Sequence, residues 1–290
     1  MPILRGLLSV LAILVFPAGV RCAWADTTFE SNGVKINYSI KGKGEPVILI
    51  HGWLSSGWIN WDLPGTTYLL AKDHQVVWLD IPAHGRSDKP TTDDAYGPEL
   101  VEHVIRLMDH LKIKKAHVVG YSMGGIITAK LMAEHPDRVL SGTLGGMGWL
   151  REGSVEQKVF ANGGRDGKPA GICFLRTRSQ TISVRRTSSP SSLGSDGLEV
   201  RRRNREVNSE RVLSLAKLAL TEDEIKSIKV PVVILFGDRD FIRKGYVEPL
   251  ERVRKDWPVI DIKDADHITC ILKPQFREEI QKWLAEHSQR

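Results

Sequence analysis

Cysteine and long apolar runs are both scarce in this sequence. Three cysteines in 290 residues cannot build a disulfide framework. The one apolar run that approaches membrane-span length lies at the amino end, which excludes a protein with several membrane spans. No internal repeat is evident, and a hydrophobic share of 41% is enough for a sizeable buried core. The composition therefore leaves one large globular domain or two small ones.

The amino-terminal apolar run is typical of a secretory signal. Arg5 supplies a positive charge before it, and Leu7–Val20 is almost entirely apolar. Ala23 and Ala25 are small residues at the two positions that a signal peptidase reads. We therefore expect a signal peptide over residues 1–25, and a secreted or periplasmic chain that has no membrane contact after cleavage.

Two alternatives to a cleaved signal are less favoured. A retained anchor is disfavoured because the run is shorter than the ~20 residues that span a bilayer. Lipid attachment at Cys22 is disfavoured because Arg21 is bulky and charged where a small residue is expected. After cleavage, Cys173 and Cys270 remain. In an oxidising compartment these two could pair, or they could stay as separate thiols.

The positive charge of the chain is concentrated in one segment. The formal net charge is +6, and residues 151–217 alone hold fourteen basic and seven acidic residues. Within that stretch, residues 176–205 are rich in arginine and serine and include Arg201–Arg203. They contain no aromatic side chain that could stack on bases, which disfavours nucleic-acid binding. We expect a solvated, partly disordered insertion and no nucleic-acid partner.

Short apolar runs alternate along the chain with amphipathic helical patterns. The candidate strands are Val34–Ile40, Val47–Ile50, Gln75–Leu79, Ala116–Val119, Val139–Leu144, Val232–Phe236 and Val259–Ile262. The candidate helices are Pro98–Leu111, Ile126–Glu134, a short helix capped by Thr221 and Glu224, and Gln275–Glu286. This alternation predicts an α/β fold whose mostly parallel sheet is covered by helices on both faces. In such sheets the active site lies at the carboxyl ends of the strands.

The candidate strand Ala116–Val119 runs into a G-x-S-x-G motif. Residues 120–125 read Gly-Tyr-Ser-Met-Gly-Gly and lead into a candidate helix. This strand–turn–helix context is that of a nucleophile elbow, in which the serine occupies the apex of a sharp, strained turn. Gly120 and Gly124 lack side chains that would collide where strand and helix approach each other. Ser122 is therefore the candidate nucleophile.

A serine hydroxyl needs a base, and the base needs an acid that orients it. Among the nine histidines, His267 follows the last candidate strand in a short loop at the same sheet edge as Ser122, so it is the candidate general base. The acid is expected in the turn Gly237–Asp240, where Asp240 is favoured over Asp238. The chain order Ser122, Asp240, His267 is that of hydrolases with a nucleophile elbow.

Another candidate strand, Val47–Ile50, ends in His51-Gly52-Trp53. Acyl transfer passes through an oxyanion that needs two donors. The backbone N–H groups of Trp53 and Met123 are the candidates, and His51 is interpreted as a structural loop histidine. No metal site is expected, because no His-x-x-x-His or Cys-x-x-Cys spacing is present.

Together these residues resemble the α/β-hydrolase superfamily, in its single-domain, esterase-like branch. The likeness covers Thr28–Leu150 and Leu220–Leu284 and includes Asp80–Ser87, which is similar to the family's D-x-P-G-H-G-x-S segment with Ala83 in place of a glycine. The resemblance implies an eight-stranded sheet, no cofactor, and a helical cap inserted after the sixth strand. Members with an aspartate nucleophile, such as haloalkane dehalogenases and epoxide hydrolases, are disfavoured because the apex residue is Ser122.

This resemblance divides the chain into a signal peptide at 1–25, a hydrolase core at 26–150 and 220–290, and a cap insertion at 151–219. The cap departs from the family pattern, since within it only Val207–Leu220 has convincing helical periodicity. Because family caps set substrate preference, the sequence leaves the natural substrate open.

The sequence hypothesis is a serine hydrolase that cleaves an ester of a small or medium apolar acid through an acyl-enzyme intermediate. The expected partner is a small-molecule ester, and the oligomeric state stays open. Trp53, Trp58, Trp61 and Trp149 are expected to wall the acyl pocket, with core packing as the alternative for each. Two other functions also stay open: carbon–carbon bond or lactone hydrolysis on the same fold, and non-catalytic binding on the same scaffold.

Overall fold

One sheet of eight strands organises the molecule. The computed structural model describes residues 27–162 and 214–289. The strands are β1 (Thr27–Ser31), β2 (Val34–Lys41), β3 (Glu45–Ile50), β4 (His74–Leu79), β5 (Ala116–Tyr121), β6 (Val139–Gly145), β7 (Val232–Gly237) and β8 (Val259–Ile262). Their spatial order is β1-β2-β4-β3-β5-β6-β7-β8. Only the pairs β1–β2 and β2–β4 are antiparallel, so the carboxyl ends of β3 to β8 lie at one edge.

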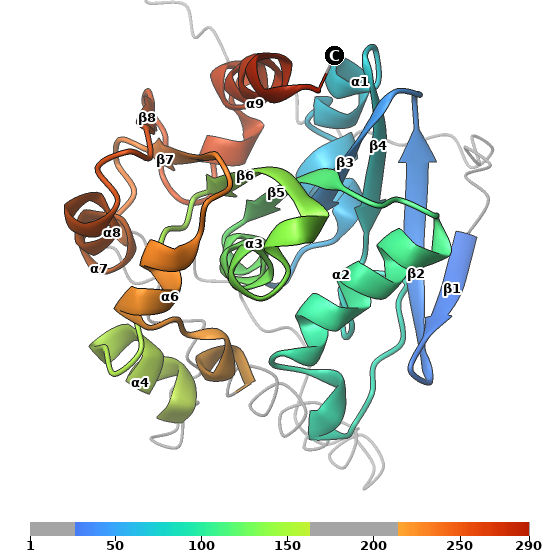
Figure 1. Cartoon of the computed structure of the whole chain (residues 1–290), viewed down its shortest axis with the longest axis horizontal. Helices are drawn as coiled ribbons and strands as arrows, with labels where there is room; N and C mark the ends of the chain where they lie inside the picture. Colours follow the sequence, from blue (N-terminus) through green and yellow to red (C-terminus); the bar gives the residue numbers. More distant parts are fainter. Residues whose placement is uncertain (1–26, 163–213, 290) are drawn as a thin grey trace, which may run out of the picture.

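Helices cover both faces of this sheet (Figure 1). Within the described ranges they are α1 (Thr66–Leu70), α2 (Glu99–His110), α3 (Met123–Glu134), α4 (Val155–Asn162), α6 (Glu222–Ser227), α7 (Arg243–Tyr246), α8 (Glu248–Val253) and α9 (Pro274–His287). A π-helical turn occupies Trp58–Asp62, and 3₁₀ turns occupy Asp93–Ala95, Pro136–Arg138, Ala216–Leu218 and Cys270–Leu272. Successive strand residues point to opposite faces. Accordingly, Ile48 and Ile50 pack with α2, α3, α6 and α8, whereas Val47 and Leu49 pack with α1 and α9.

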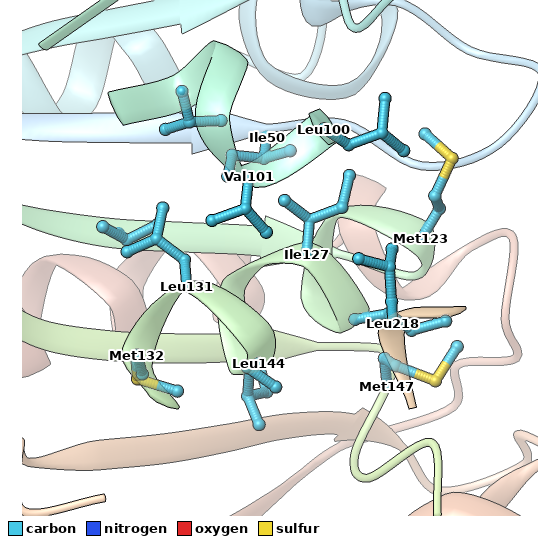
Figure 2. Packing of buried hydrophobic residues seen from close by; sticks show 14 of the residues in the cluster. Ile50, Leu100, Val101, Met123, Ile127, Leu131, Met132, Leu144, Met147 and Leu218 are labelled. Carbon is cyan, nitrogen blue, oxygen red and sulfur yellow. The ribbon is translucent and has the colours of Figure 1, made fainter. Parts of the chain in front are cut away.

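The buried apolar side chains form two clusters, one on each face of the sheet. Helix α3 lies inside the larger cluster, which includes residues of α2, α3, α6 and α8. Its residues Met123–Met132 are all buried, as expected for a helix that is apolar on every side. Figure 2 shows Ile127 and Leu131 of α3 beside Val101 of α2, with Leu218 near the amino end of α3. Burial of one such side chain stabilises the fold by ~1.5–3 kcal/mol. This packing fixes the start of α3, which is where Ser122 lies.

The expected α/β architecture is confirmed, and five elements escaped the sequence analysis: β1, α1, α4, α7 and α8. Strand β1 has mostly polar residues, and it forms only because it pairs with β2 at the edge of the sheet. Helix α4 corrects the prediction that only Val207–Leu220 is helical within the cap region. Ser154 caps α4 by accepting the Gln157 backbone N–H at 3.1 Å, and the Gln157 side chain accepts the Gly153 N–H at 2.7 Å. These two hydrogen bonds satisfy backbone N–H groups at the start of α4, whose eight residues are too weakly periodic to predict a helix.

Several sequence predictions fall outside the described residues. They concern the signal peptide at 1–25, the arginine- and serine-rich segment at 176–205, and Cys173. Cys270 is described, and it is a buried free thiol. Over residues 27–162 and 214–289, no helix combines the length and the apolar character needed to cross a bilayer.

Candidate active site

Ser122 occupies a strained turn between β5 and α3. Its backbone has φ 53° and ψ −115°, a conformation that non-glycine residues rarely adopt. A Cβ at Gly120 would lie 2.0 Å from the Gly124 carbonyl oxygen, and a Cβ at Gly124 would lie 2.1 Å from the Ile50 carbonyl oxygen. Both separations are far inside van der Waals contact. The two glycines of the motif are therefore required by the close approach of β3, β5 and α3.

The structure brings Ser122, His267 and Asp240 together at the carboxyl edge of the sheet. The Ser122 Oγ lies 2.9 Å from the His267 Nε2, and the His267 Nδ1 lies 2.8 Å from the Asp240 Oδ2. An ionised carboxylate only accepts hydrogen bonds, so the His267 Nδ1 carries the proton. The Nε2 is then the acceptor of the Ser122 hydroxyl. This tautomer places an accepting nitrogen against the Ser122 hydroxyl.

Asp240, and not Asp238, reaches the histidine. The Asp240 side chain is fully buried, and its second oxygen accepts the Ile242 N–H at 3.2 Å. Asp238 is exposed and accepts the Ala265 N–H at 3.1 Å, which lowers the pKa of its carboxyl. Asp238 thus fixes the start of the loop that carries His267, while Asp240 contacts the imidazole.

The His267 loop is held on two sides. Asp266 accepts the backbone N–H groups of Ile268 at 3.0 Å and Thr269 at 2.8 Å, and the hydrogen bond from Thr269 is the main cause of its lowered pKa. The Tyr121 hydroxyl donates to the His267 carbonyl oxygen at 2.6 Å. Sequence reasoning missed Tyr121, because it fills a variable position of the G-x-S-x-G motif and nothing in the sequence marks its distant partner.

The loop after β3 lies against the nucleophile. A Cβ at Gly52 would be 3.2 Å from the Ser122 Cβ, so the next residue, Trp53, is adjacent to the apex. The Asn60 Oδ1 accepts the Gly52 N–H at 2.8 Å and fixes this loop. Met123 is the first residue of α3, and N–H groups in the first turn of a helix have no partner within the helix. Met123 thus directly follows Ser122, and Trp53 directly follows Gly52, which lies against Ser122. Asn60 is a further supporting residue that the sequence analysis did not identify.

His51 has a structural environment. It is fully buried, its Nε2 accepts the Ile81 N–H at 3.0 Å, and its Nδ1 lies 2.7 Å from the Gly52 carbonyl oxygen. The Ile81 donor requires an unprotonated Nε2, so the Nδ1 donates to Gly52. Burial lowers the pKa of His51 to about 4. The neutral imidazole ties the β3 loop to the segment after β4.

This burial predicts a loss of stability in mild acid. Burial also lowers the pKa of His103 to about 4, from an ordinary histidine value of 6.5. Between these two pH values the unfolded chain binds protons that the folded chain does not bind, so the free energy of unfolding falls as the pH falls. Each histidine contributes a slope of up to about 1.4 kcal/mol per pH unit. Urea unfolding of wild type and His51→Asn across this window measures the slope. Equal slopes for the two proteins would contradict the lowered pKa of His51.

Of the four tryptophans expected to wall an acyl pocket, two are buried in the core. Trp61 is fully buried in the apolar cluster beneath α1 and α9. Trp149 is also buried, and its indole N–H donates to the Leu220 carbonyl oxygen at 2.8 Å. Trp58 is half exposed, beside a hollow that Asp80 and other residues line. For Trp61 and Trp149 the alternative, core packing, is what the structure shows.

A small apolar cavity does border the two expected oxyanion donors. Trp53 and Met123 line it together with Tyr96, Leu100 and Leu215. Of the tryptophans considered at the sequence level, Trp53 is thus the one that combines an apolar surface with a place beside Ser122. It is the better candidate for contact with an acyl group.

Comparison with known proteins agrees with this architecture. A family model described as the α/β-hydrolase fold matches residues 45–157. A 2-hydroxymuconate semialdehyde hydrolase of a Pseudomonas species is 36% identical over 113 residues, which are 37% of this chain and 38% of that protein. An acetyltransferase component of the acetoin cleaving system of Cupriavidus necator is 37% identical over 148 residues, which are 48% of this chain and 38% of that protein. The chain thus spans about two fifths of the length of these curated relatives.

Solved structures show the same fold over most of the chain. A meta-cleavage product hydrolase from Pseudomonas fluorescens superposes with a TM-score of 0.64 and 23% identity, covering 90% of this chain and 98% of that one. An epoxide hydrolase from Vigna radiata superposes with a TM-score of 0.62 and 18% identity, covering 90% and 97%. At these identities the likeness concerns the fold alone. With its sheet order and its nucleophile elbow, the chain has the α/β-hydrolase fold.

Proposed function

We propose that the protein is a serine hydrolase that cleaves a carboxylic ester through an acyl-enzyme intermediate. The observation that carries this proposal is the continuous hydrogen-bonded line from Ser122 through His267 to Asp240, at 2.9 and 2.8 Å. A serine that only stabilises a turn has no need of a histidine whose far nitrogen is bound to a buried carboxylate.

The geometry supports the following steps. The Ser122 Oγ attacks the ester carbonyl carbon while its proton moves to the His267 Nε2. Asp240 stabilises the imidazolium that forms, and the Trp53 and Met123 N–H groups bind the oxyanion. His267 then gives the proton to the departing alkoxide. A water molecule repeats the sequence on the acyl-enzyme, releases the acid and restores Ser122.

A fluorophosphonate probe tests the nucleophile directly. Such a reagent phosphonylates an activated serine and does not react with an ordinary hydroxyl. We expect one adduct per chain, located by mass spectrometry on the peptide that contains Ser122, and no adduct in Ser122→Ala. An unlabelled wild-type protein that is folded would support a non-catalytic binding protein instead.

Carbon–carbon bond hydrolysis is the second candidate, and one observation favours it. The relative that is 36% identical over 113 residues is named for hydrolysis of 2-hydroxymuconate semialdehyde. A panel of 4-nitrophenyl esters with increasing acyl length, assayed beside 2-hydroxymuconate semialdehyde and a set of lactones, separates the reactions. The ester proposal expects the largest kcat/KM on a short or medium acyl ester. A larger value on the semialdehyde would replace it with the second candidate.

A further inference from the structure

A second group of chemistry-bearing side chains lies at the opposite edge of the sheet. Glu45 and His74 are the first residues of β3 and β4, and His117 is the second residue of β5. These three strands are neighbours in the order β4-β3-β5. Glu45 is the register partner of His74, and His117 is the partner of Val47, two residues beyond Glu45. The amino ends of three parallel strands therefore bring a carboxylate and two imidazoles together.

The pleat of the sheet directs these three side chains to one face. Residues two apart along a strand point the same way. Val47, Val76 and Val119, each two residues beyond one member of the group, all belong to the apolar cluster beneath α1 and α9. Glu45, His74 and His117 therefore continue that face to the end of the sheet. Figure 1 shows α1 and α9 over this side.

The donor atoms of this group lie close enough together to hold a metal ion. One donor atom from each of the three residues lies within 4.8 Å of the other two. The His117 Nε2 is 2.9 Å from the Glu45 Oε2, and the His117 Nδ1 is 2.7 Å from the Ser141 Oγ. His74 is only 5% exposed, and its Nδ1 is buried without a hydrogen-bond partner among the described residues. A buried imidazole nitrogen that has no partner is costly unless a further group binds there.

We propose that Glu45, His74 and His117 bind a divalent transition-metal ion such as zinc. Two imidazoles and one carboxylate are donors that zinc accepts, at about 2.0–2.2 Å. Magnesium and calcium prefer sites made of oxygen atoms, so the two histidines select against them. Side-chain rotations would bring the three donor atoms, which now lie within 4.8 Å of one another, to the spacing of ligands around one ion.

The hydrogen bonds around His117 can adapt to an ion. Without a metal, the ionised Glu45 accepts from the Nε2–H, and the Nδ1 accepts from the Ser141 hydroxyl. A metal on the Nε2 requires the other tautomer, with the proton on the Nδ1. The Ser141 hydroxyl then accepts instead of donating, which a freely rotating hydroxyl allows. Ser141 is thus placed to orient the ligand in either state, as the outer partners of metal-bound histidines do.

The site ties together distant parts of the chain. The Glu45 Oε1 also accepts the Gln289 N–H at 3.1 Å, so the residues after α9 meet the three strands here. The group lies at the amino edge of the sheet, whereas Ser122, Asp240 and His267 follow the carboxyl ends of their strands. The ion is therefore assigned a structural role, independent of the proposed hydrolysis.

Metal titration of the untagged full-length chain tests this site. After chelation and dialysis, calorimetry with zinc chloride should give one ion per chain, and zinc should raise the Tm. The cobalt(II) absorption spectrum should report nitrogen ligation. His74→Gln should weaken zinc binding at least about tenfold and abolish the rise in Tm. Glu45→Gln changes a residue at the partly exposed rim and should have the same two effects. It provides the test if His74→Gln fails to fold.

Two control variants make the result specific. His135→Gln disrupts the other group of possible ligands in the described residues, Glu102, Glu134 and His135, and should leave the zinc affinity unchanged. Ser122→Ala should bind zinc like wild type, which separates this proposal from the proposed hydrolysis. Absence of zinc binding, or equal affinity in wild type, His74→Gln and Glu45→Gln, would overturn the site.

Discussion

Ser122→Gly is expected to abolish ester turnover and at the same time to stabilise the fold. Loss of the nucleophile of a serine–histidine pair lowers kcat by about 10⁵- to 10⁶-fold. The backbone of Ser122, at φ 53°, lies in a region where non-glycine residues carry strain of about 1–3 kcal/mol. Glycine adopts such angles freely, but it has more conformational entropy to lose on folding. The net expectation is a gain of about 1 kcal/mol in the free energy of unfolding.

The matched control for this prediction is Ser122→Ala. Alanine also removes the hydroxyl but keeps a Cβ, so its kcat should fall equally while the strain stays. Steady-state kinetics on a 4-nitrophenyl ester and urea unfolding of both variants provide the two measurements. The strain argument fails if Ser122→Gly is less stable than Ser122→Ala. The nucleophile assignment fails if either variant keeps more than about 1% of the wild-type kcat.

The sequence predicted the elements around Ser122 well because their physics is local. Residues 116–134 alone contain the recognisable patterns: a buried parallel strand, two glycines that allow close approach, and a helix that is apolar on all sides. Ala83 is a position where the residue type does not reveal the backbone conformation. It replaces the family's usual glycine and has φ 73° in the structure, which is the conformation that makes glycine usual there.

Features that depend on distant pairing could not be predicted in this way. Trp61 and Trp149 were expected beside a substrate because large aromatic side chains suit both pockets and cores, and only tertiary packing decides between them. The group of Glu45, His74 and His117 has no recognisable ligand spacing, since three separate strands contribute one residue each. Its members become neighbours only through the sheet order β4-β3-β5.

Asp240→Asn should lower kcat by about 10⁴-fold and leave the fold intact. The Asp240 carboxylate accepts from the His267 Nδ1 at 2.8 Å and so fixes the tautomer whose Nε2 is free to accept a proton. An asparagine amide in this place donates to the Nδ1 and moves the imidazole proton to the Nε2. A protonated Nε2 cannot accept the Ser122 proton, which is why the loss is large although the shape hardly changes. KM should change little, because Asp240 is buried behind the histidine and does not reach the substrate.

Asp238→Asn is the control that distinguishes the two aspartates of this turn. Asp238 is exposed, and it uses one oxygen to accept the Ala265 N–H, which an asparagine carbonyl oxygen can still do. Its kcat should stay within about twofold of wild type, since no contact with His267 is lost. Equal losses in the two variants would mean that the turn acts as a structural unit and not through one carboxylate. A large loss of kcat in Asp238→Asn alone would assign the orienting role to Asp238. It would contradict the role inferred from the 2.8 Å contact between Asp240 and His267.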